Sequence, residues 1–340
     1  MRTCVVGVGR VGRQHARILS ELPDAELVGV HDPDVERGGR VARACGTRHF
    51  TDLESLLGRV DAAVVSVPSH AHHRVGRAAL QAGCHVLIEK PLAPTLDEAD
   101  DLIGLAEERN LMLGVGHVER FNAAVRSCEP FLEQPRFVES LRLAPFQPRG
   151  TDVTVILDLM IHDIDLVLDL VPGKVVALSA VGVPVLSSSV DIANARLTFD
   201  TGAVANITAS RVSTQRKREL RLFQSNGYLS LDLASGRGEF LRRREGARMK
   251  PAGMGADAGG PPALHAPSLA LEDIVERVGL EGDGTEPLRL ELESYVRAVR
   301  GERSSVVPAV EARAALEVAL RITREVEEFA HVVAQDSRRA

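Results

Sequence analysis

The chain has 340 residues, of which 44% are hydrophobic and 26% are charged, so it is long enough for two domains that each bury a core. Its formal net charge of −6 offers no general attraction to nucleic acid or to an anionic membrane, so any phosphate-bearing ligand must be held by local groups. The four cysteines form no C-x-x-C pair, and neither a membrane-spanning apolar stretch nor a secretion signal is visible. We expect a cytoplasmic protein with reduced thiols that binds neither nucleic acid nor membrane.

The first part of the chain alternates short apolar stretches with amphipathic ones. Strands are expected at residues 3–6, 26–31, 62–67, 85–88 and 111–115. Two pairs, Thr51 with Glu54 and Thr95 with Glu98, have the capping-box spacing that predicts the start of a helix. Repeated strand–helix units of this length predict an α/β fold with a doubly wound parallel sheet over residues 1–120.

After about residue 120 the pattern becomes that of hairpin-connected strands. They are expected at residues 137–143, 175–180, 193–199, 203–210, 219–224 and 228–233. Helices are expected at residues 153–170, 288–300 and 310–333. The turns DTG at 200–202 and NG at 226–227 favour hairpins, and the Gly-, Ala- and Pro-rich stretch at 244–267 is expected to be a mobile loop. Residues 121–340 therefore form a second α/β domain with a largely antiparallel open sheet.

A glycine-rich turn joins the first predicted strand to the first predicted helix. Its sequence GVGRVG matches the dinucleotide-binding pattern G-x-G-x-x-G. The first glycine permits a tight turn, the second lets a pyrophosphate approach the backbone, and the third lets the helix pack closely on the strand. The N–H groups at the helix N-terminus suit a pyrophosphate, and an ordinary turn is the alternative. The predicted cofactor residues here are Gly7, Val8, Gly9, Arg10, Val11 and Gly12.

Asp32 ends the second predicted strand, 20 residues after Gly12. At this place a carboxylate accepts hydrogen bonds from the adenosine ribose and repels a 2′-phosphate. No arginine immediately follows Asp32, so the sequence favours NAD over NADP. A helix N-cap is the alternative role for this carboxylate.

Lys90, in the stretch Glu89-Lys90-Pro91, lies just beyond a predicted parallel strand. Ligands bind at the carboxyl ends of the strands in such sheets. Burial and nearby cations can lower the pKa of a lysine there, so that it hydrogen-bonds an alcohol and shares its proton. The alternative is a solvated lysine before a turn proline.

A polar stripe marks an otherwise apolar helix that reads VILDLMIHDIDLVLDL over residues 155–170. Asp158, His162, Asp165 and Asp169 fall on one face at helical spacing. Because an unpaired buried carboxylate is costly, such a stripe needs partners or a function. Asp158 can orient His162, which is then a plausible general base. The two later aspartates could instead pair with basic residues. One histidine among carboxylates is a poor ligand set for zinc, so no metal is expected.

Together these residues resemble the Gfo/Idh/MocA family of oxidoreductases over nearly the whole chain. The resemblance rests on GVGRVGRQHARIL at 7–19, VPSHAH at 67–72, EKP at 89–91 and DLMIH at 158–162. It implies a Rossmann domain followed by an α/β domain whose open sheet mediates a homodimer or homotetramer. It also implies Lys90 and His162 as the catalytic pair, with Asp158 close by.

The family resemblance also implies a cofactor wall around the second of these motifs. Val67, Pro68 and His72 match the segment that lines the cofactor, and Glu89 joins them from the EKP motif. The family commonly has asparagine where this chain has Ser69, which weakens any role for that position.

A narrower resemblance, to UDP-N-acetylglucosamine 3-dehydrogenases, lies in GHVERFNAAVR at 116–126 and in residues 158–170, although Ala123 stands where proline is expected. It implies that NAD takes a hydride from C3 of the nucleotide-sugar, and that an aminotransferase then uses the keto-sugar on the way to lipid A. The candidates for gripping the substrate, besides the catalytic residues, are His117, Arg120, Asn122 and Arg211. Arg120 could instead pair with Glu119, and Arg211 could be a surface strand residue.

Three other functions remain compatible with the sequence. One is a dehydrogenase of another sugar or polyol, such as inositol, and a second is a reductase working in the opposite direction. The third is a non-catalytic NAD-binding sensor, against which the presence of Lys90, Asp158 and His162 argues.

Overall fold

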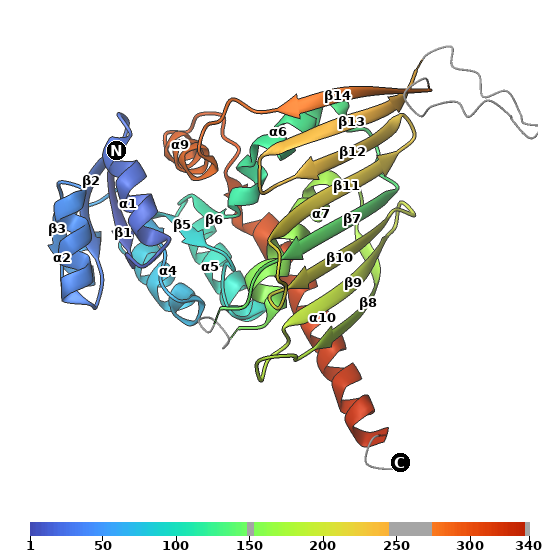
Figure 1. Ribbon diagram of the computed structural model, residues 1–340. Coiled ribbons are helices and arrows are strands. Elements are labelled where there is room, and N and C mark those ends of the chain that lie inside the picture. Colours follow the sequence, from blue (N-terminus) through green and yellow to red (C-terminus); the bar gives the residue numbers. More distant parts are fainter. Residues whose placement is uncertain (148–152, 245–273, 337–340) are drawn as a thin grey trace, which may run out of the picture.

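The computed structural model describes residues 1–147, 153–244 and 274–336. Figure 1 shows two parts, each built on its own sheet. The expected loop at 244–267 lies outside the described residues, apart from its first position. Within the described ranges, no helix is both long and apolar enough to cross a membrane.

The first sheet is the predicted doubly wound one. Its seven strands lie in the order β15-β6-β5-β4-β1-β2-β3, and all neighbours are parallel except β15 with β6. The strands are β1 (Arg2–Val6), β2 (Glu26–His31), β3 (Arg48–Phe50), β4 (Ala62–Val65), β5 (His85–Glu89), β6 (Leu113–Gly116) and β15 (Val307–Pro308). The helices that alternate with them are α1 (Gly12–Glu21), α2 (Val35–Ala44), α3 (Leu53–Leu57), α4 (His72–Gln81) and α5 (Leu96–Glu108).

The two predicted capping boxes have different outcomes. Thr95 caps α5 as expected, since its hydroxyl accepts from the backbone N–H of Glu98 at 3.2 Å. The box at Thr51 is wrong, because α3 begins after Asp52, whose carboxylate accepts from the N–H of Ser55 at 2.9 Å. A carboxylate is the better N-cap acceptor of two adjacent candidates.

The second sheet has eight strands in the order β14-β13-β12-β11-β7-β10-β9-β8. They are β7 (Phe137–Leu143), β8 (Val175–Val183), β9 (Ile192–Phe199), β10 (Val204–Ser210), β11 (Lys217–Gln224), β12 (Gly227–Asp232), β13 (Arg237–Arg243) and β14 (Val275–Glu281). All neighbours are antiparallel except β7 with β10, so the expected largely antiparallel sheet is confirmed.

Strands β13 and β14 were not predicted from the sequence. Both are rich in charge, and ion pairs such as Arg242–Glu276 at 2.9 Å and Arg277–Glu239 at 3.2 Å join them. Pairing between segments that are distant along the chain, rather than a strong apolar alternation, makes them strands.

Helices cover one face of the second sheet. Figure 1 shows α6 (Ala123–Cys128), α7 (Ile161–Leu170) and α10 (Ala309–Asp336) on that side. The helix expected from residue 153 instead begins with a π-helical turn at Ile156–Met160, which continues into α7. A π turn has i→i+5 bonds, so it rotates the side chains before it relative to those that follow.

The end of the chain returns to the first sheet. Helix α9 (Pro287–Val299) places the fully buried Tyr295 against it, and the phenol donates to the carbonyl of His85 at 2.9 Å. Strand β15 then extends the edge of the same sheet beside β6. The segment from 287 to 308 therefore packs with the first part, although the expected boundary near residue 120 assigned it to the second.

Candidate active site

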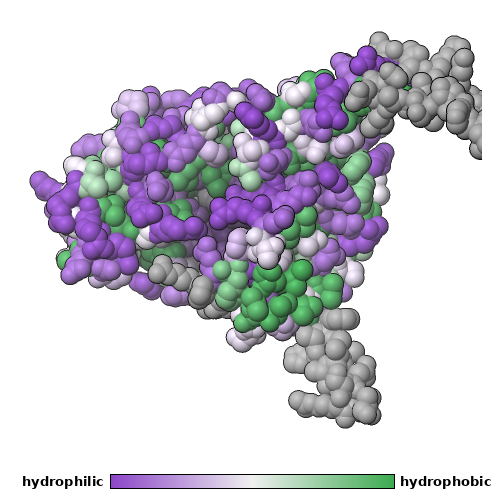
Figure 2. Space-filling model, viewed as in Figure 1, coloured by the Kyte–Doolittle hydropathy of each residue, from purple (hydrophilic) through white to green (hydrophobic). Residues whose placement is uncertain are grey.

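A cleft of about 1330 Å³ lies between the two parts of the molecule. Figure 2 shows the surface hollowed between them, with mostly hydrophilic residues around the opening. The cleft is lined by the carboxyl ends of β1, β2, β4 and β5 on one side and by the ends of β7 and β11 on the other. This is the edge at which parallel sheets bind ligands.

The glycine turn between β1 and α1 has the shape that a dinucleotide needs. Gly7 has a φ of +86°, and a Cβ there would lie 2.6 Å from the carbonyl oxygen of Ser66. A Cβ on Gly12 would lie 1.8 Å from the carbonyl oxygen of Gly7, whereas one on Gly9 would have nothing within 4 Å. The turn is therefore tight at its ends and open in the middle, where a pyrophosphate can approach the backbone.

Asp32 stands beside this turn, and Arg37 holds it. The Val8 N–H donates to the carboxylate at 2.9 Å, and Arg37 forks onto both oxygens at 2.6 and 3.0 Å. Burial alone would raise the pKa of Asp32, but Arg37 and the backbone donors lower it. The sequence reasoning considered only an arginine immediately after Asp32 and missed this one, which reaches back from the first turn of α2.

His72 ties two walls of the cleft together. Its buried ring lies between the carbonyl oxygens of Pro91, at 2.7 Å from Nδ1, and Val67, at 2.9 Å from Nε2. Burial lowers the pKa of His72. Val67 and Pro68 line the cleft beside it, so the predicted cofactor wall is one continuous surface.

Lys90 and Asp158 meet inside the cleft. The Lys90 Nζ donates to the backbone carbonyl of Asp158 at 2.5 Å and lies 3.5 Å from its carboxylate. Burial lowers the pKa of Lys90, and Asp158 partly offsets that effect. The carboxylate pairs with Lys90, whereas the sequence suggested that it orients His162; Asp158 lies within the π turn and His162 lies in the α-helix that follows it.

His162 lines the same cleft and is held in its neutral form. Burial lowers its pKa well below the ordinary histidine value, and the nearby cations Lys90 and Arg142 lower it further. Among the described residues, its buried Nδ1 has no hydrogen-bond partner. A neutral imidazole beside an ammonium group is suited to accept a proton from a hydroxyl.

Glu89 has a partner that the sequence reasoning missed. His15 of α1 lies 2.7 Å from the Glu89 carboxylate, which links the helix after the glycine turn to the strand that carries Lys90. Burial would raise the pKa of Glu89, but His15 and Lys90 lower it overall. No sequence motif joins residues 15 and 89, and only the folding of the first sheet, with α1 packed on β1 and β2, brings them together.

Three of the four additional substrate candidates lie outside the cleft lining. Arg120 forks onto Asp165 at 2.7 and 2.9 Å, so its predicted alternative pairing with Glu119 is not the one observed. Asn122 caps α6, and the buried His117 lies 3.7 Å from Asp165. Their contact with a substrate stays a prediction.

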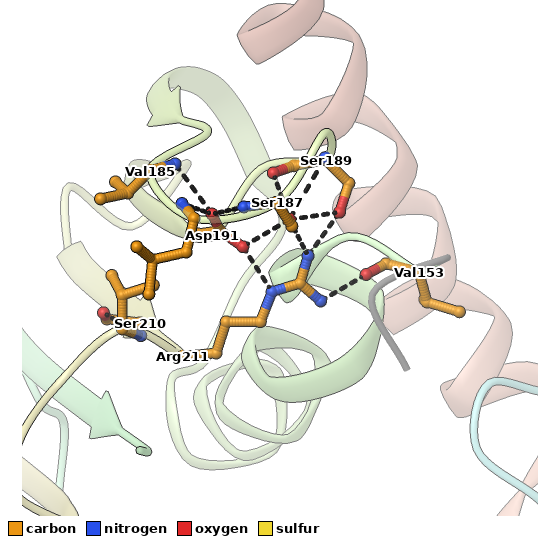
Figure 3. Close-up of polar contacts among 9 residues, drawn as sticks. Val153, Val185, Ser187, Ser189, Asp191, Ser210 and Arg211 are labelled. Atoms are coloured by element: carbon orange, nitrogen blue, oxygen red, sulfur yellow. Dashed lines mark hydrogen bonds and ion pairs between the residues drawn. The ribbon is translucent and has the colours of Figure 1, made fainter. Parts of the chain in front are cut away.

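Arg211 lines the cleft, but its guanidinium is engaged within the protein. Figure 3 shows it directed at Asp191, Ser187 and Ser189, with one arm on the carbonyl of Val153. The distances are 2.8 Å to Asp191, 3.2 Å to Ser187 and 2.7 Å to Val153. Arg211 is therefore a buried residue that links the β8–β9 loop to the segment before the π turn, and not a surface strand residue.

A second buried arginine on the sheet side was also missed. Arg142 forks onto Asp163 at 2.6 and 3.1 Å and donates to Glu119 at 2.9 Å. Arg218 of β11 approaches the same Glu119 at 3.2 Å. Among the described residues, no group of three or more His, Cys, Asp or Glu side chains is placed to hold a metal.

Comparison with known proteins identifies the family. The sequence model of the oxidoreductase family with an NAD-binding Rossmann fold, Gfo/Idh/MocA, matches residues 1–117, and that of the family's C-terminal domain matches residues 125–230. The chain belongs to the Gfo/Idh/MocA family. Its first part is accordingly an NAD-binding Rossmann domain, and the protein is an NAD-dependent oxidoreductase.

Several members of this family resemble the chain. It is 36% identical to a UDP-N-acetylglucosamine 3-dehydrogenase of Acidithiobacillus ferrooxidans, over 97% of this chain and 98% of that protein. A solved structure of that dehydrogenase superposes with a TM-score of 0.85 at 35% identity, covering 97% of this chain and 98% of the other. An NAD-dependent scyllo-inositol 2-dehydrogenase of Bacillus subtilis is 27% identical over 63% of this chain and 68% of its own length.

Proposed function

We propose that this enzyme oxidises the 3-hydroxyl of UDP-N-acetylglucosamine to a ketone with NAD. The observation that carries the proposal is the match along nearly the full length of both chains to a UDP-N-acetylglucosamine 3-dehydrogenase. The cleft supports it, because Lys90, Asp158 and His162 meet beside the glycine turn.

The chain's own residues have distinct roles in the proposed reaction. NAD, when bound along the glycine turn, supplies the nicotinamide that accepts the hydride from C3. His162 takes the hydroxyl proton, for which its neutral imidazole is suited. Lys90 donates a hydrogen bond to the same oxygen and stabilises the negative charge that develops on it. Asp158 holds Lys90 in place.

The direct test is a turnover assay with purified protein and NAD. UDP-N-acetylglucosamine, other UDP-sugars, free sugars and inositols are offered separately, and the NADH absorbance is followed. A 2-oxo acid is added in parallel to recycle cofactor that stays bound, and the keto-sugar is sought by mass spectrometry. Oxidation of UDP-N-acetylglucosamine supports the proposal. If only a free polyol is oxidised, the proposed substrate is wrong and the proposed catalytic residues stand.

The setting of the reaction is part of the proposal. A 3-keto nucleotide-sugar is a substrate for an aminotransferase, so we propose that such an enzyme consumes the product. We also propose that the enzyme works in the cytoplasm.

We propose that the protein is a homodimer or homotetramer. Figure 2 shows a hydrophobic patch near β8 and the loop that follows it. The exposed hydrophobic residues of this strand and loop include Val183, Val185 and Leu186. Large exposed apolar patches of this kind are typical of protein interfaces. Light scattering after size exclusion, on the wild type and on Leu186→Asp, tests this; a wild-type monomer would contradict it.

A further inference from the structure

Two arginines face each other across neighbouring strands at the sheet side of the cleft. Arg218 of β11 is the direct cross-strand partner of Arg142 on β7, and both line the cleft. Arg216 lies two residues before Arg218 and lines the cleft as well. Like charges directly opposite each other in a sheet are unfavourable, so this arrangement calls for compensating negative charge.

The described residues supply only part of that negative charge. The buried Arg142 is fully engaged by Asp163 and Glu119. Among the described residues, Arg218 makes one hydrogen bond, from Nη1 to Glu119 at 3.2 Å, and its side chain is 40% exposed. Arg216 has no hydrogen bond or ion pair to any residue of the described ranges.

The excess of positive charge around Arg218 is reflected in its pKa. Burial lowers its pKa, and Arg142 and Arg216 lower it further, whereas Glu119 opposes them. An arginine whose surroundings disfavour its charge is stabilised by an added anion.

Of the other arginines that line the cleft, two are bound to aspartates, and Arg10, Arg13 and Arg74 lie on the wall formed by the first part of the molecule, with the glycine turn. Arg211 is bound to Asp191, and Arg37 is bound to Asp32. The glycine turn and the N-terminus of α1, on the opposite wall, account for the pyrophosphate of NAD. Arg216 and Arg218 therefore face a different anion from the one that the cofactor carries.

We propose that Arg216 and Arg218 bind the diphosphate of the nucleotide-sugar, an inference that rests on the proposed function. In UDP-N-acetylglucosamine the diphosphate is attached to C1, two bonds around the ring from C3. When C3 is placed at His162, the diphosphate must lie close to the catalytic pair. Both arginines line the same cleft as His162, and Arg218 is near enough to lower the pKa of that imidazole. Guanidinium groups suit this task because their planar donors bind phosphate oxygens in pairs.

Equilibrium binding of UDP to the NAD-saturated protein tests the proposal, with uridine as the uncharged comparison. The variants are Arg216→Gln, Arg218→Gln, the double variant and Arg218→Lys. The matched control is Lys217→Gln, because Lys217 lies between the two arginines, is 45% exposed, pairs with Glu219 and does not line the cleft. Circular dichroism and NAD affinity verify that each variant is folded.

We expect each single glutamine variant to weaken UDP binding roughly tenfold and the double variant roughly a hundredfold, since each loses a charge-assisted contact. Uridine binding and NAD affinity should stay within about twofold, Arg218→Lys should retain part of the affinity, and Lys217→Gln should match the wild type. Equal UDP affinity in the wild type and the double variant would overturn the proposal, as would a wild type that binds UDP no better than uridine. Wild-type turnover of UDP-N-acetylglucosamine, measured separately, shows whether the proposed function fails on its own.

Discussion

At the proposed catalytic centre, burial is the main influence on the pKa of Lys90 and His162. Lys90 is surrounded by protein, so its pKa is lowered, and the backbone carbonyl of Asp158 directs its amine. We expect Lys90→Met to reduce kcat by about 10²–10³, the usual loss when one hydrogen-bond donor to a developing negative charge is removed. Affinity for NAD should change little, because the glycine turn is untouched. Stopped-flow turnover and NAD titration measure the two effects, and an unchanged kcat would remove Lys90 from the mechanism.

We expect Asp32 and Arg37 together to decide the choice between NAD and NADP. In the wild type Arg37 is bound to the carboxylate, which repels a 2′-phosphate. We expect Asp32→Ala to weaken NAD and to improve NADP, because Arg37 is then free to bind the 2′-phosphate. The double variant Asp32→Ala with Arg37→Ala should lose the NADP gain. Steady-state kinetics with both cofactors test this, and an equal NADP gain in both variants would exclude Arg37 from the effect.

Glu291 of α9 is a fully buried carboxyl with no hydrogen-bond partner among the described residues. Burial raises its pKa well above the ordinary value, and the carboxylates of Glu89 and Asp165 raise it further. The folded state therefore keeps a proton that the unfolded chain releases above about pH 4.3. Stability must then fall as the pH rises from that value towards the folded pKa.

We expect Glu291→Gln to remove this pH dependence, since glutamine resembles the protonated acid. In urea unfolding at about pH 5 and pH 8, the stability of the variant relative to the wild type should increase as the pH rises. Glu293→Gln, on the same helix but only partly buried, is the control. A constant difference between variant and wild type across this range would mean that Glu291 is not protonated in the folded protein.

Among the elements, the loop between β8 and β9 depends on one buried carboxylate. Asp191 accepts from the backbone N–H groups of Val185, Leu186 and Ser187 at 2.6–2.8 Å, and Arg211 donates to it from the other side (Figure 3). Burial would raise the pKa of Asp191, but these donors lower it far below the ordinary range.

We expect Asp191→Ala to lower the free energy of unfolding by about 3–5 kcal/mol, because it leaves Arg211 buried without its counter-ion. The paired variant Asp191→Ala with Arg211→Met should recover part of the loss. Denaturant unfolding at neutral pH measures both. A loss below about 1 kcal/mol would show that the loop is held by other contacts.

Element prediction succeeded where local pattern is strong. Five strands of the first sheet and the capping box at Thr95 follow from apolar periodicity and side-chain hydrogen bonding within a few residues, whereas the short β3 and β15 were not predicted. The π turn at 156–160 breaks the regular spacing on which the polar stripe was read. In the structure Asp158, within this turn, lies beside Lys90. Asp163, which the sequence analysis did not include in the stripe, binds Arg142.

For the whole molecule, the two parts are not two independent halves of the sequence. Tyr295 is fully buried against the first sheet, and β15 pairs with its edge strand β6. We expect the fragment 1–120 to melt at a lower temperature than the full chain or to aggregate, because it lacks this cover. A second fragment, in which a short linker joins residues 1–120 to residues 287–308, should have a higher melting temperature by circular dichroism than the fragment 1–120 alone. Equal stability of both fragments would make the returning segment dispensable.

The sequence alone determined the Rossmann turn, the place of Asp32 and the order of most elements, while Lys90 and His162 as the catalytic pair remain a prediction from the family resemblance. These depend on short-range patterns, in which glycines, apolar periods and neighbouring residues report local geometry. Only the tertiary structure decided which charged groups are free. Arg120 and Arg211 are bound by carboxylates distant in the chain, whereas Arg216 and Arg218 face the cleft. The reason is physical: a buried charge needs a counter-ion, and the fold rather than the spacing along the chain selects that partner.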